Sequence, residues 1–452
     1  MKSLYNIAIL FYALGVRVAA LFNRKVRLMW QGEQEAYAKI EAGLKDGDRV
    51  VWVHAASLGE FEQGRPLIEK LKRENPEYKI LLTFFSPSGY EVRKNYASAD
   101  VIAYLPLDTP RNARRFVELV KPEKVVFVKY EFWLNYLAEL RGRGVDTYII
   151  SAIFRKEQVF FKWYGGLFRE GLKAFKKLFV QNEESKELLK EIGVENVIVA
   201  GDTRFDRVAD VAAAAKKLEI VERFVNAQCT TNGLELQRKM HNAQLPVLVV
   251  GSSWGPDEEL LARYINERAG KMKMIIAPHE VSEERIKELT EKLSCKWMLY
   301  NEELGMRNEE LDPSVLRTPP LKQGRNIVRH SDLGDADCLV VNTIGVLSSV
   351  YQYGQVAYIG GGFGVGIHNT LEAAAWGMPV VFGPNYKKFK EACELIECGA
   401  GQSIKNYEEC ARALDYFFEN NKEASKAAAE YVASHTGATE LIHNAQFIIH
   451  NS

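Results

Sequence analysis

Short apolar runs that alternate with helical patterns are the feature that most constrains the fold of this 452-residue chain. From Arg49 onward the runs are almost continuously apolar, which is typical of strands buried on both faces of a parallel sheet that helices cover. The first series closes near Asp206. Its runs are VVWVHAA, KILLTFFS, VIAYLP, VVFVKYEFW, TYIISAIF, KLFVQN and NVIVAGD.

A second series comes later in the chain, with the runs PVLVVGSSW, KMIIAP, CLVVN, VAYIGGG and VVFGP. Two series predict two doubly wound α/β domains, in a chain that is too long for one ordinary core. We expect a first domain over 31–206, an inter-domain region over 207–245 and a second domain over 246–452 that includes the C-terminal helices. A charged excursion is expected over 301–335. Because ligands of such sheets bind beyond the carboxyl ends of the strands, the two domains should face a cleft with a site on each lip.

The composition indicates a globular protein and no nucleic-acid partner. Hydrophobic residues make up 47% of the chain and the formal net charge is zero, so the positive surface that a polyanion requires is not expected. The six cysteines form no CxxC pair, which favours reduced thiols in a cytoplasmic setting. No HxxxH, HExxH or DxD pattern occurs, and we therefore expect neither a metal nor another cofactor.

The first thirty residues differ from the rest of the chain. Apolar residues fill most of Leu4–Phe22, and a helix of that length would cover roughly 30 Å, enough for a bilayer core. Asn6 and Arg17 would share one face, which also fits a helix lying in the plane of the interface. Residues 1–30 are therefore expected to form a membrane-associated helix, with a buried core helix as the alternative. Five cations precede the first acidic residue: Lys2, Arg17, Arg24, Lys25 and Arg27. The cluster of the last three favours a cytoplasmic location for the rest of the chain.

The segment Val356–Pro384 is rich in glycine and indicates a strand, a loop, a helix over Thr370–Trp376 and a second strand. Glycines let the backbone approach a ligand, and the N–H groups that open a helix suit a phosphate. Glu372 would then accept hydrogen bonds from ribose hydroxyls. A dinucleotide fingerprint is absent because Ile367 stands where its third glycine should fall. A tight turn without a ligand is the alternative.

Two carboxylates follow strands of the first series. Glu60 opens a helix directly after a strand. At that position it either acts as a general base or only stabilises the helix by placing a negative charge at the positive end of its dipole. Glu131 stands beside Trp133, where apolar neighbours would favour its protonated form, or where Lys129 would pair with it.

Other residues at the strand ends offer hydroxyl or backbone groups to the same lips. Each of these residues is weak evidence alone, because every doubly wound domain needs turns at its strand ends. Together they indicate a binding site at the strand ends. His368 either contacts a phosphate or caps the helix. The first-domain candidates are Ser57, Gly59, Arg65, Ser86, Ser88 and Gly89, and those of the second domain are Ser253, His279, Asn342, Gly345, Gly364, Gly366, His368, Asn369 and Glu372.

In this order, the motifs resemble the family of 3-deoxy-D-manno-oct-2-ulosonic acid (Kdo) transferases, whose GT-B architecture has two Rossmann-like domains. The similarity extends over most of the chain. The motifs that carry it are HAASLGE, SPSGY, YLPLDTP, YEFWLNYL, QNEESKELLKEIGVENVIVAGDTRFD, NTIGVLSSVY, IGGGFGVGIHNTLEAAAWGMPVVFGP and KKFKEA.

The resemblance implies transfer of Kdo from CMP-Kdo to a hydroxyl of a phosphorylated lipid A precursor, lipid IVA, at the cytoplasmic face of the inner membrane. Glu60 matches the family's catalytic base and Glu131 its second functional acid. The family's donor-binding helix matches His368, Asn369 and Glu372. An activated donor needs only alignment, deprotonation of the acceptor and stabilisation of the leaving phosphate, so we expect a single inverting displacement.

Three positions depart from the family pattern. Lys129 stands where an acid is common, His279 where an arginine usually follows Ala-Pro, and Val346 where an acid usually follows NTIG. The donor phosphate contacts and the number of sugars transferred are therefore open. Two alternatives also stay open: a nucleotide-sugar epimerase or a GT-B transferase with another donor, and a non-catalytic nucleotide-binding module attached to the membrane.

Overall fold

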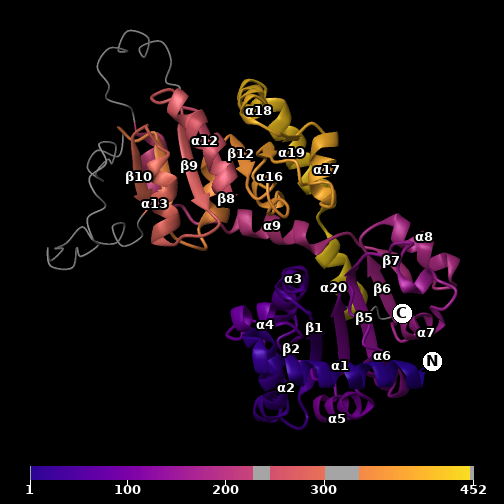
Figure 1. The fold of residues 1–452 in the computed structure, drawn as a ribbon. Helices are drawn as coiled ribbons and strands as arrows, with labels where there is room; N and C mark the ends of the chain where they lie inside the picture. The colour runs from indigo at the N-terminus through magenta and orange to yellow at the C-terminus, as the bar shows by residue number, and fades with distance from the viewer. Residues whose placement is uncertain (1, 228–244, 301–334, 448–452) are drawn as a thin grey trace. The chain divides into compact units, whose positions relative to one another are not determined.

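The computed structural model describes residues 2–227, 245–300 and 335–447 (Figure 1). The chain forms two compact units, Met1–Arg207 with His435–Ser452, and Val208–Ser434. The polar segment over 229–244 and the expected excursion over 301–335, apart from its last residue, lie outside the described residues.

The first unit contains a sheet of seven parallel strands in the order β3-β2-β1-β4-β5-β6-β7. Each run of the first series forms one of these strands. The order reverses direction between β1 and β4, which pair with each other, and this is the switch point at which such sheets bind ligands. The strands are β1 (Arg49–His54), β2 (Tyr78–Phe84), β3 (Val101–Tyr104), β4 (Lys124–Val128), β5 (Asp146–Ala152), β6 (Lys177–Val180) and β7 (Val197–Val199).

Helices cover this sheet because its strands are apolar on both faces. Successive side chains of a strand point to opposite faces, and accordingly Trp52 belongs to one core cluster whereas Val51 and Val53 belong to the other. The helices are α1 (Lys2–Phe22), α2 (Arg24–Gly43), α3 (Leu58–Glu74), α4 (Pro87–Arg93), α5 (Pro110–Val120), α6 (Leu134–Gly142), the 3-10 turn η1 (Val159–Phe161), α7 (Gly166–Leu172), α8 (Glu183–Glu191) and α20 (Ala438–Phe447). Helix α9 (Thr203–Ala213) begins in the first unit and passes into the second at Val208.

The second unit also contains seven parallel strands, in the order β10-β11-β9-β8-β12-β13-β14, with its switch point between β8 and β12. The strands are β8 (Val247–Ser253), β9 (Lys273–Pro278), β10 (Trp297–Tyr300), β11 (Cys338–Val341), β12 (Val356–Ile359), β13 (Val380–Phe382) and β14 (Gly401–Ser403). The two edge strands, β10 and β14, were not expected from the apolar runs. β14 is the tripeptide Gly-Gln-Ser, which carries no apolar side chain.

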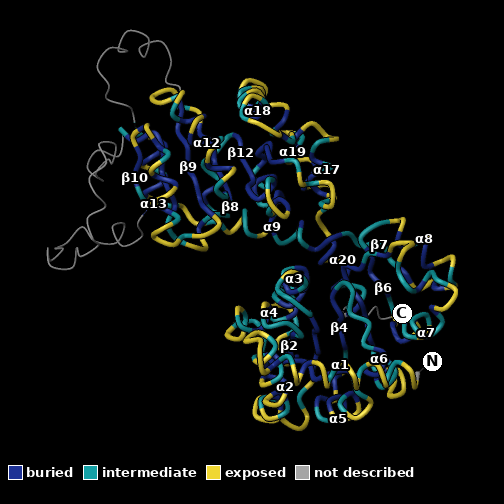
Figure 2. Tube along the Cα trace, in the orientation of Figure 1, coloured by how far each residue is buried: buried dark blue, intermediate teal, exposed yellow. Residues whose placement is uncertain are grey.

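Helices and turns fill the connections of the second unit. In Figure 2 the tube is dark blue along most labelled strands of both units, which agrees with strands covered on both faces. The helical elements are α10 (Glu219–Asn226), α12 (Gly255–Glu267), α13 (Glu283–Glu291), α15 (Leu347–Val350), the 3-10 turn η3 (Tyr351–Tyr353), α16 (Leu371–Ala374), α17 (Lys390–Glu397), α18 (Tyr407–Glu419) and α19 (Asn421–His435).

Two expected domain borders are wrong. The second domain does not extend to residue 452, because α20 belongs to the first unit, where Ile442 is fully buried and His443 Nε2 lies 2.8 Å from Asn75 Oδ1. The region expected between the domains contains α10, which belongs to the second unit and buries Phe224 there. Amphipathic periodicity identifies a helix but not the sheet that it covers.

Helix α1 packs against the first unit along one side only. Tyr5 donates a hydrogen bond of 2.6 Å to Asp108, Asn135 donates one of 2.9 Å to Asn6, and Val16 and Ala20 are buried. Among the described residues, one helical segment is long and apolar enough to cross a membrane, Ser3–Phe22, with a mean hydropathy of 1.8. Most of α1 is exposed, so it is not a core helix. Its exposed apolar side chains are Leu4, Ile7, Leu10, Phe11, Tyr12, Leu14, Val18, Leu21 and Phe22.

Candidate active site

The loops that follow β1 and β2 are joined into one surface. The N–H groups of Phe85 and Ser86 both donate to the carbonyl of Ala56, at 3.2 and 2.7 Å. A Cβ on Gly89 would lie 2.3 Å from the Phe84 ring and 3.1 Å from the carbonyl carbon of Ser57. Gly89 is therefore required for the close approach of the two loops.

Glu60 lies in the first turn of α3 and is partly exposed at the switch point of the first sheet. Ser57, which precedes the helix, donates its hydroxyl to the Glu60 carboxylate. Gly59 is exposed between them. On the neighbouring loop, Ser86 caps α4 by accepting from the N–H of Ser88. The structure thus brings five of the six first-domain candidates for substrate binding, all except Arg65, to the same two loops as Glu60.

Glu131 follows β4, next to β1, and is held more firmly. Trp133 Nε1 donates to Glu131 Oε2 at 2.6 Å, and the same carboxylate oxygen lies 3.4 Å from His54 Nε2. His54 is fully buried at the end of β1, and its Nδ1 is 2.9 Å from the hydroxyl of Thr83. The Glu131 side chain is 14% exposed. This carboxylate is therefore fixed by two strands and still reaches the surface.

His54 and Trp133 were not predicted as site residues. A histidine at the last position of an otherwise apolar strand was the sequence feature that could have indicated His54, since a fully buried imidazole needs partners. Lys129, which we expected beside Glu131, has its ammonium 5.4 Å from the centroid of the Tyr130 ring. No sequence feature indicated that Trp133 would contact both Glu131 and His54.

Of the four residues other than glycine with a positive φ among the described residues, Lys121 ends α5 and the other three lie at the carboxyl ends of strands. Lys129 after β4, Ser151 in β5 and Ser252 in β8 have φ angles of +68°, +51° and +54°. The last two stand where the pairing register of each sheet shifts. Residues other than glycine rarely adopt such angles, and they cluster at ligand sites. Both sheets therefore carry the irregularity at the edge where the candidate loops lie.

Arg65 lies apart from these loops, in the second turn of α3. Its guanidinium is 2.7 Å from Glu69 and 3.7 Å from Glu62, and it lies over the Tyr96 ring. Two carboxylates already balance its charge. Its contact with an acceptor stays a prediction.

Three aromatic rings stack at the strand ends of the second sheet. The centroids of Trp254 and His279 are 4.6 Å apart, and those of His279 and His368 are 4.4 Å apart. Trp254 Nε1 donates to His368 Nε2 at 3.1 Å, which leaves Nδ1 of the neutral ring as a donor. Burial lowers the pKa of His368, and the adjacent His279 lowers it further. His279, which is exposed, stacks between Trp254 and His368, and the three rings thus link the loops after β8, β9 and β12.

Asp257 in α12 anchors two of these loops and was missed by the sequence reasoning. Its carboxylate accepts from the N–H groups of Trp254 and Gly361, at 3.0 and 2.9 Å, and from the hydroxyl of Tyr358 at 2.8 Å. An acid at the third position of a helix that follows a strand and begins with Gly-Pro was the available indication. Asp257 places Trp254 next to the glycine loop at the switch point.

The glycine loop after β12 folds tightly on itself. The carbonyl of Gly361 accepts from the N–H groups of Gly364 and Gly366, at 3.0 and 3.3 Å. Gly366 has a φ of +146°, and a Cβ there would meet Phe389 at 2.8 Å. The following helix, α16, has four residues instead of the seven expected over 370–376. Its dipole is correspondingly small, so the loop itself must provide most contacts to an anion.

Polar groups in the loops after β11 and β12 have unused hydrogen-bonding capacity. The side-chain oxygens Asn342 Oδ1 and Thr370 Oγ1 are buried and have no hydrogen-bond partner among the described residues. Asn369 Nδ2 donates to Glu372 Oε1 at 3.1 Å and so orients that carboxylate. Buried polar atoms without partners are uncommon in native proteins and fit a bound polar ligand. Ser253, by contrast, is buried and donates to Glu258 at 3.3 Å, and Gly345 is exposed with a φ of +95°.

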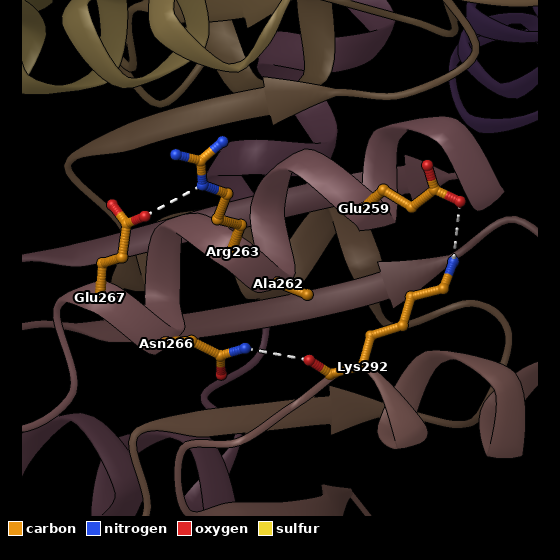
Figure 3. A pocket seen from close by; sticks show the side chains of 6 residues that line it. All are labelled: Glu259, Ala262, Arg263, Asn266, Glu267 and Lys292. Carbon is orange, nitrogen blue, oxygen red and sulfur yellow. Dashed lines mark hydrogen bonds and ion pairs between the residues drawn. The ribbon is translucent and has the colours of Figure 1, made fainter.

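Two of the pockets on the described surface differ in character. One, of about 430 Å³, lies on α12 and the end of α13 (Figure 3), where Arg263 pairs with Glu267, Lys292 lies 3.8 Å from Glu259, and Asn266 bonds the Lys292 carbonyl. Its polar groups are paired with one another. The other, of about 550 Å³, is lined by Glu131 and Trp133 and thus adjoins the first-unit site.

The chain is similar to Kdo transferases over most of its length. The family model described as 3-deoxy-D-manno-octulosonic-acid transferase matches residues 29–207. The 3-deoxy-D-manno-octulosonic acid transferase of Aquifex aeolicus is 26% identical over 384 residues, which are 84% of this chain and 89% of the relative. That of Bordetella pertussis is 26% identical over 408 residues, 86% and 85% of the two chains.

Solved structures of low sequence identity share the fold. UDP-GlcNAc 2-epimerase from Neisseria meningitidis superposes with a TM-score of 0.55 at 15% identity, covering 87% of this chain and 98% of the other. A glycosyltransferase from Rickettsia africae superposes with a TM-score of 0.50 at 13% identity, covering 90% and 100%. At these identities the likeness concerns the fold alone.

The two parallel-sheet α/β domains have the GT-B fold. Within this fold, the chain is similar to the Kdo transferases: their family model matches residues 29–207, and the two relatives named above are each 26% identical to this chain.

Proposed function

We propose that the protein transfers Kdo from CMP-Kdo to a hydroxyl of a phosphorylated lipid A precursor, lipid IVA, in a single displacement that inverts the anomeric centre. The observation that carries this proposal is Glu60, a partly exposed carboxylate at the switch point of the first sheet, in the loop after β1, with the fixed carboxylate of Glu131 in the loop after the neighbouring strand β4. A base at this position takes the proton of the attacking hydroxyl. The hydroxyl of Ser57, which bonds Glu60, orients that base.

On the donor side, the loops of the second unit are assigned to CMP-Kdo. The N–H groups of the glycine loop and the imidazoles of His279 and His368 would receive the departing phosphate, and Glu372 would bind the ribose hydroxyls. The partnerless oxygens Asn342 Oδ1 and Thr370 Oγ1 support a polar ligand here. We assign no metal or other cofactor to the reaction, because the donor is already activated.

Because the proposed acceptor is a lipid, the enzyme would meet it at a membrane. We place the enzyme at the cytoplasmic face of the inner membrane, with the exposed apolar side of α1 in the bilayer interface. The packed side of α1, with Tyr5 and Asn6 hydrogen-bonded to the first unit, supports a helix that lies in the interface over one that spans it.

Incubation of the purified protein with CMP-Kdo and lipid IVA tests the reaction. We expect release of CMP together with a lipid product heavier by one or more Kdo residues. CMP release without a change in lipid mass would contradict transfer, and an altered donor sugar in place of a lipid product would point to an epimerase. Omission of the lipid acceptor is the control, since a transferase should then release little CMP.

A further inference from the structure

The pocket of about 550 Å³ beside Glu131 has a role that the proposed reaction does not assign. Several elements of the first unit build it. Its walls include Tyr5 from α1, Phe132 and Trp133 from the loop after β4, Phe160 from η1 and Phe168 from α7. Aromatic rings therefore surround most of the space.

The rings form a continuous apolar surface. The centroid of Phe160 lies 4.7 Å from that of Phe132 and 6.0 Å from that of Phe168. Phe160 is buried, whereas Phe132 and Phe168 are partly exposed. Covering such a surface with hydrocarbon is favourable, and the free energy released is proportional to the apolar area removed from water.

Charged and polar groups occupy the rest of the lining. The guanidinium of Arg155 donates to the hydroxyl of Tyr130 at 3.3 Å, and the Gln158 side chain accepts from the Arg155 N–H at 3.0 Å. Glu131 adds the carboxylate that Trp133 holds. The pocket thus combines an apolar wall with an anion-binding guanidinium and a carboxylate that accepts from hydroxyls, which fits an amphiphile and not a free sugar.

The surfaces on both sides of the pocket are apolar and exposed. On one side Tyr5 belongs to α1, whose Leu4 and Ile7 are exposed. On the other side the turn between η1 and α7 carries Trp163, which is 91% exposed, and Tyr164, which is also exposed. Exposed Trp and Tyr residues are typical of proteins that meet a membrane interface. Exposed apolar side chains of α1 and of this turn therefore accompany the pocket on elements that line it or adjoin its lining.

We infer that this pocket binds a hydrocarbon chain of the acceptor lipid, so that the polar head of the lipid lies at Glu131 and Arg155. This assignment rests on the proposed function for the identity of the lipid, but the chemistry of the pocket requires only an alkyl chain attached to an anionic head. The enzyme would then select acylated acceptors by direct contact, in addition to concentrating them at the membrane.

A photo-crosslinking experiment tests the pocket without depending on activity. Dodecyl phosphate with a diazirine at the end of its chain is added to the full-length protein below its micelle concentration, irradiated, and mapped by mass spectrometry. We expect crosslinks in the peptides that contain Phe132, Phe160 and Phe168. Crosslinks confined to the outer face of α1, or spread without preference, would overturn the inference.

Two variants and a control sharpen the test. Phe168→Gln makes the wall polar, and Val159→Trp reduces the space while keeping the wall apolar; both residues are only half-buried, so the fold should survive. Phe168→Gln should reduce pocket crosslinking about tenfold, the affinity that one buried apolar side chain is worth. Val159→Trp should also reduce it, because the larger ring occupies the space that the alkyl chain would fill. Tyr416→Gln, which removes an exposed aromatic ring from the second unit, should leave it unchanged. Equal crosslinking in all variants would overturn the inference.

Kinetics separates this inference from the proposed function. With lipid IVA, Phe168→Gln should raise the acceptor KM about tenfold and leave the donor KM unchanged, whereas a deacylated acceptor should show no difference between variant and parent. Equal acceptor KM values for variant and parent with lipid IVA would overturn the pocket and leave the transferase standing. Absence of transfer to any acceptor, with crosslinks in the pocket, would overturn the proposed function and leave the pocket standing.

Discussion

Glu60 and Glu131 have different surroundings at the same edge of the first sheet. Glu60 is partly exposed, and its hydrogen bond comes from the hydroxyl of Ser57. Glu131 is held by the indole of Trp133 and approached by the buried His54. The contrast favours Glu60 as the base that exchanges protons with the acceptor, and Glu131 as a fixed acceptor of hydrogen bonds that positions it.

Replacing Glu60 by glutamine should therefore abolish most turnover while preserving the fold and CMP binding. Glutamine keeps the size of the side chain but cannot take a proton, and general-base catalysis is worth about 10²–10⁴-fold. Turnover at saturating CMP-Kdo and acceptor, with a melting curve, measures this. Glu62→Gln is the matched control, because Glu62 lies in the same helix and pairs with Arg93 at 2.7 Å. Turnover of Glu60→Gln within about threefold of the parent would exclude Glu60 as the base.

Glu372→Ala should weaken donor binding more than it slows turnover at saturating donor. Asn369 orients the Glu372 carboxylate at 3.1 Å, and a charge-assisted hydrogen bond to a ribose is worth about 1.5–3 kcal/mol, on the order of tenfold to a hundredfold in affinity. Calorimetric titration with CMP checks this. Glu419→Ala, at an exposed position of α18, should bind CMP like the parent. Equal affinities for all three proteins would remove Glu372 from the site.

A buried carboxylate in α2 predicts a pH-dependent stability. Glu33 is 6% exposed, and burial raises the pKa of its carboxyl group to about 8. Below its ordinary pKa, both the folded and the unfolded state hold the proton. Between that value and about 8 the unfolded chain has released the proton whereas the folded protein keeps it, so stability falls as pH rises, by up to about 1.4 kcal/mol per pH unit.

Glu33→Gln, which cannot ionise, should remove this dependence. We expect the variant and the parent to melt at similar temperatures at about pH 4.5, and the variant to melt higher at about pH 8. Melting curves in one detergent at both pH values measure it. Glu35→Gln is the control, since Glu35 is exposed in the same helix and pairs with Lys39. Parallel pH profiles for parent and Glu33→Gln would contradict the prediction.

At the scale of single elements, α1 combines two surfaces that the apolar run did not distinguish. Its inner side is tied to the first unit through Tyr5 and Asn6, and Val16 and Ala20 are buried there. Its outer side is a row of exposed apolar side chains. The helix therefore belongs to the fold and also provides the surface expected of an interfacial helix.

Deletion of residues 1–23 should leave a folded protein that partitions into the soluble fraction. No strand is lost, and the main cost is the exposure of surface beneath Val16 and Ala20 together with the loss of partners for Asp108 and Asn135. Fractionation and circular dichroism of the truncated protein measure both results. As a control, Leu14→Glu on the exposed side should weaken membrane association without affecting melting. A large loss of helical signal on deletion would show that the fold requires α1.

At the scale of the whole molecule, the last helix belongs to the first unit. Asp206 accepts from the N–H groups of Gly437 and Thr439 at 2.6 and 2.7 Å and from the Thr439 hydroxyl at 2.7 Å. Lys70 pairs with Glu440 at 2.6 Å. The first unit is thus built from both ends of the chain, and its completion requires the C-terminus.

Asp206→Ala should therefore destabilise the first unit and leave the second unit unaffected. Three hydrogen bonds to one carboxylate are lost, each worth about 1.5–3 kcal/mol when the partner is charged, although the sum is smaller because water replaces some of them. Hydrogen exchange resolved by peptide should show faster exchange in α20 and α3 but not in β8 or β9. Asp46→Ala, which removes an exposed ion pair with Lys121, is the control. Faster exchange in both units alike would contradict the assignment of α20.

The amino-acid sequence by itself determined the two parallel sheets and the loops that end their strands. An apolar run that is buried on both faces has one stable environment, a covered parallel sheet, and the order of the strands then places the loops after β1 and β8 at the switch points. The fold class was predicted on this basis and is confirmed. The similarity to Kdo transferases was predicted from the ordered motifs, and it agrees with the matching family model and relatives. The short edge strand β14 was not predicted because its three residues carry no periodic apolar pattern.

Only the tertiary structure decided which side chains meet. The contact of His54 with Glu131, the anchoring of two loops by Asp257, and the stack of Trp254, His279 and His368 join segments that are far apart in the chain. The packing of α20 on the first unit and the one-sided packing of α1 are of the same kind. Periodicity records whether a side chain is buried, but the partner that buries it depends on the closure of long loops, which local sequence does not encode.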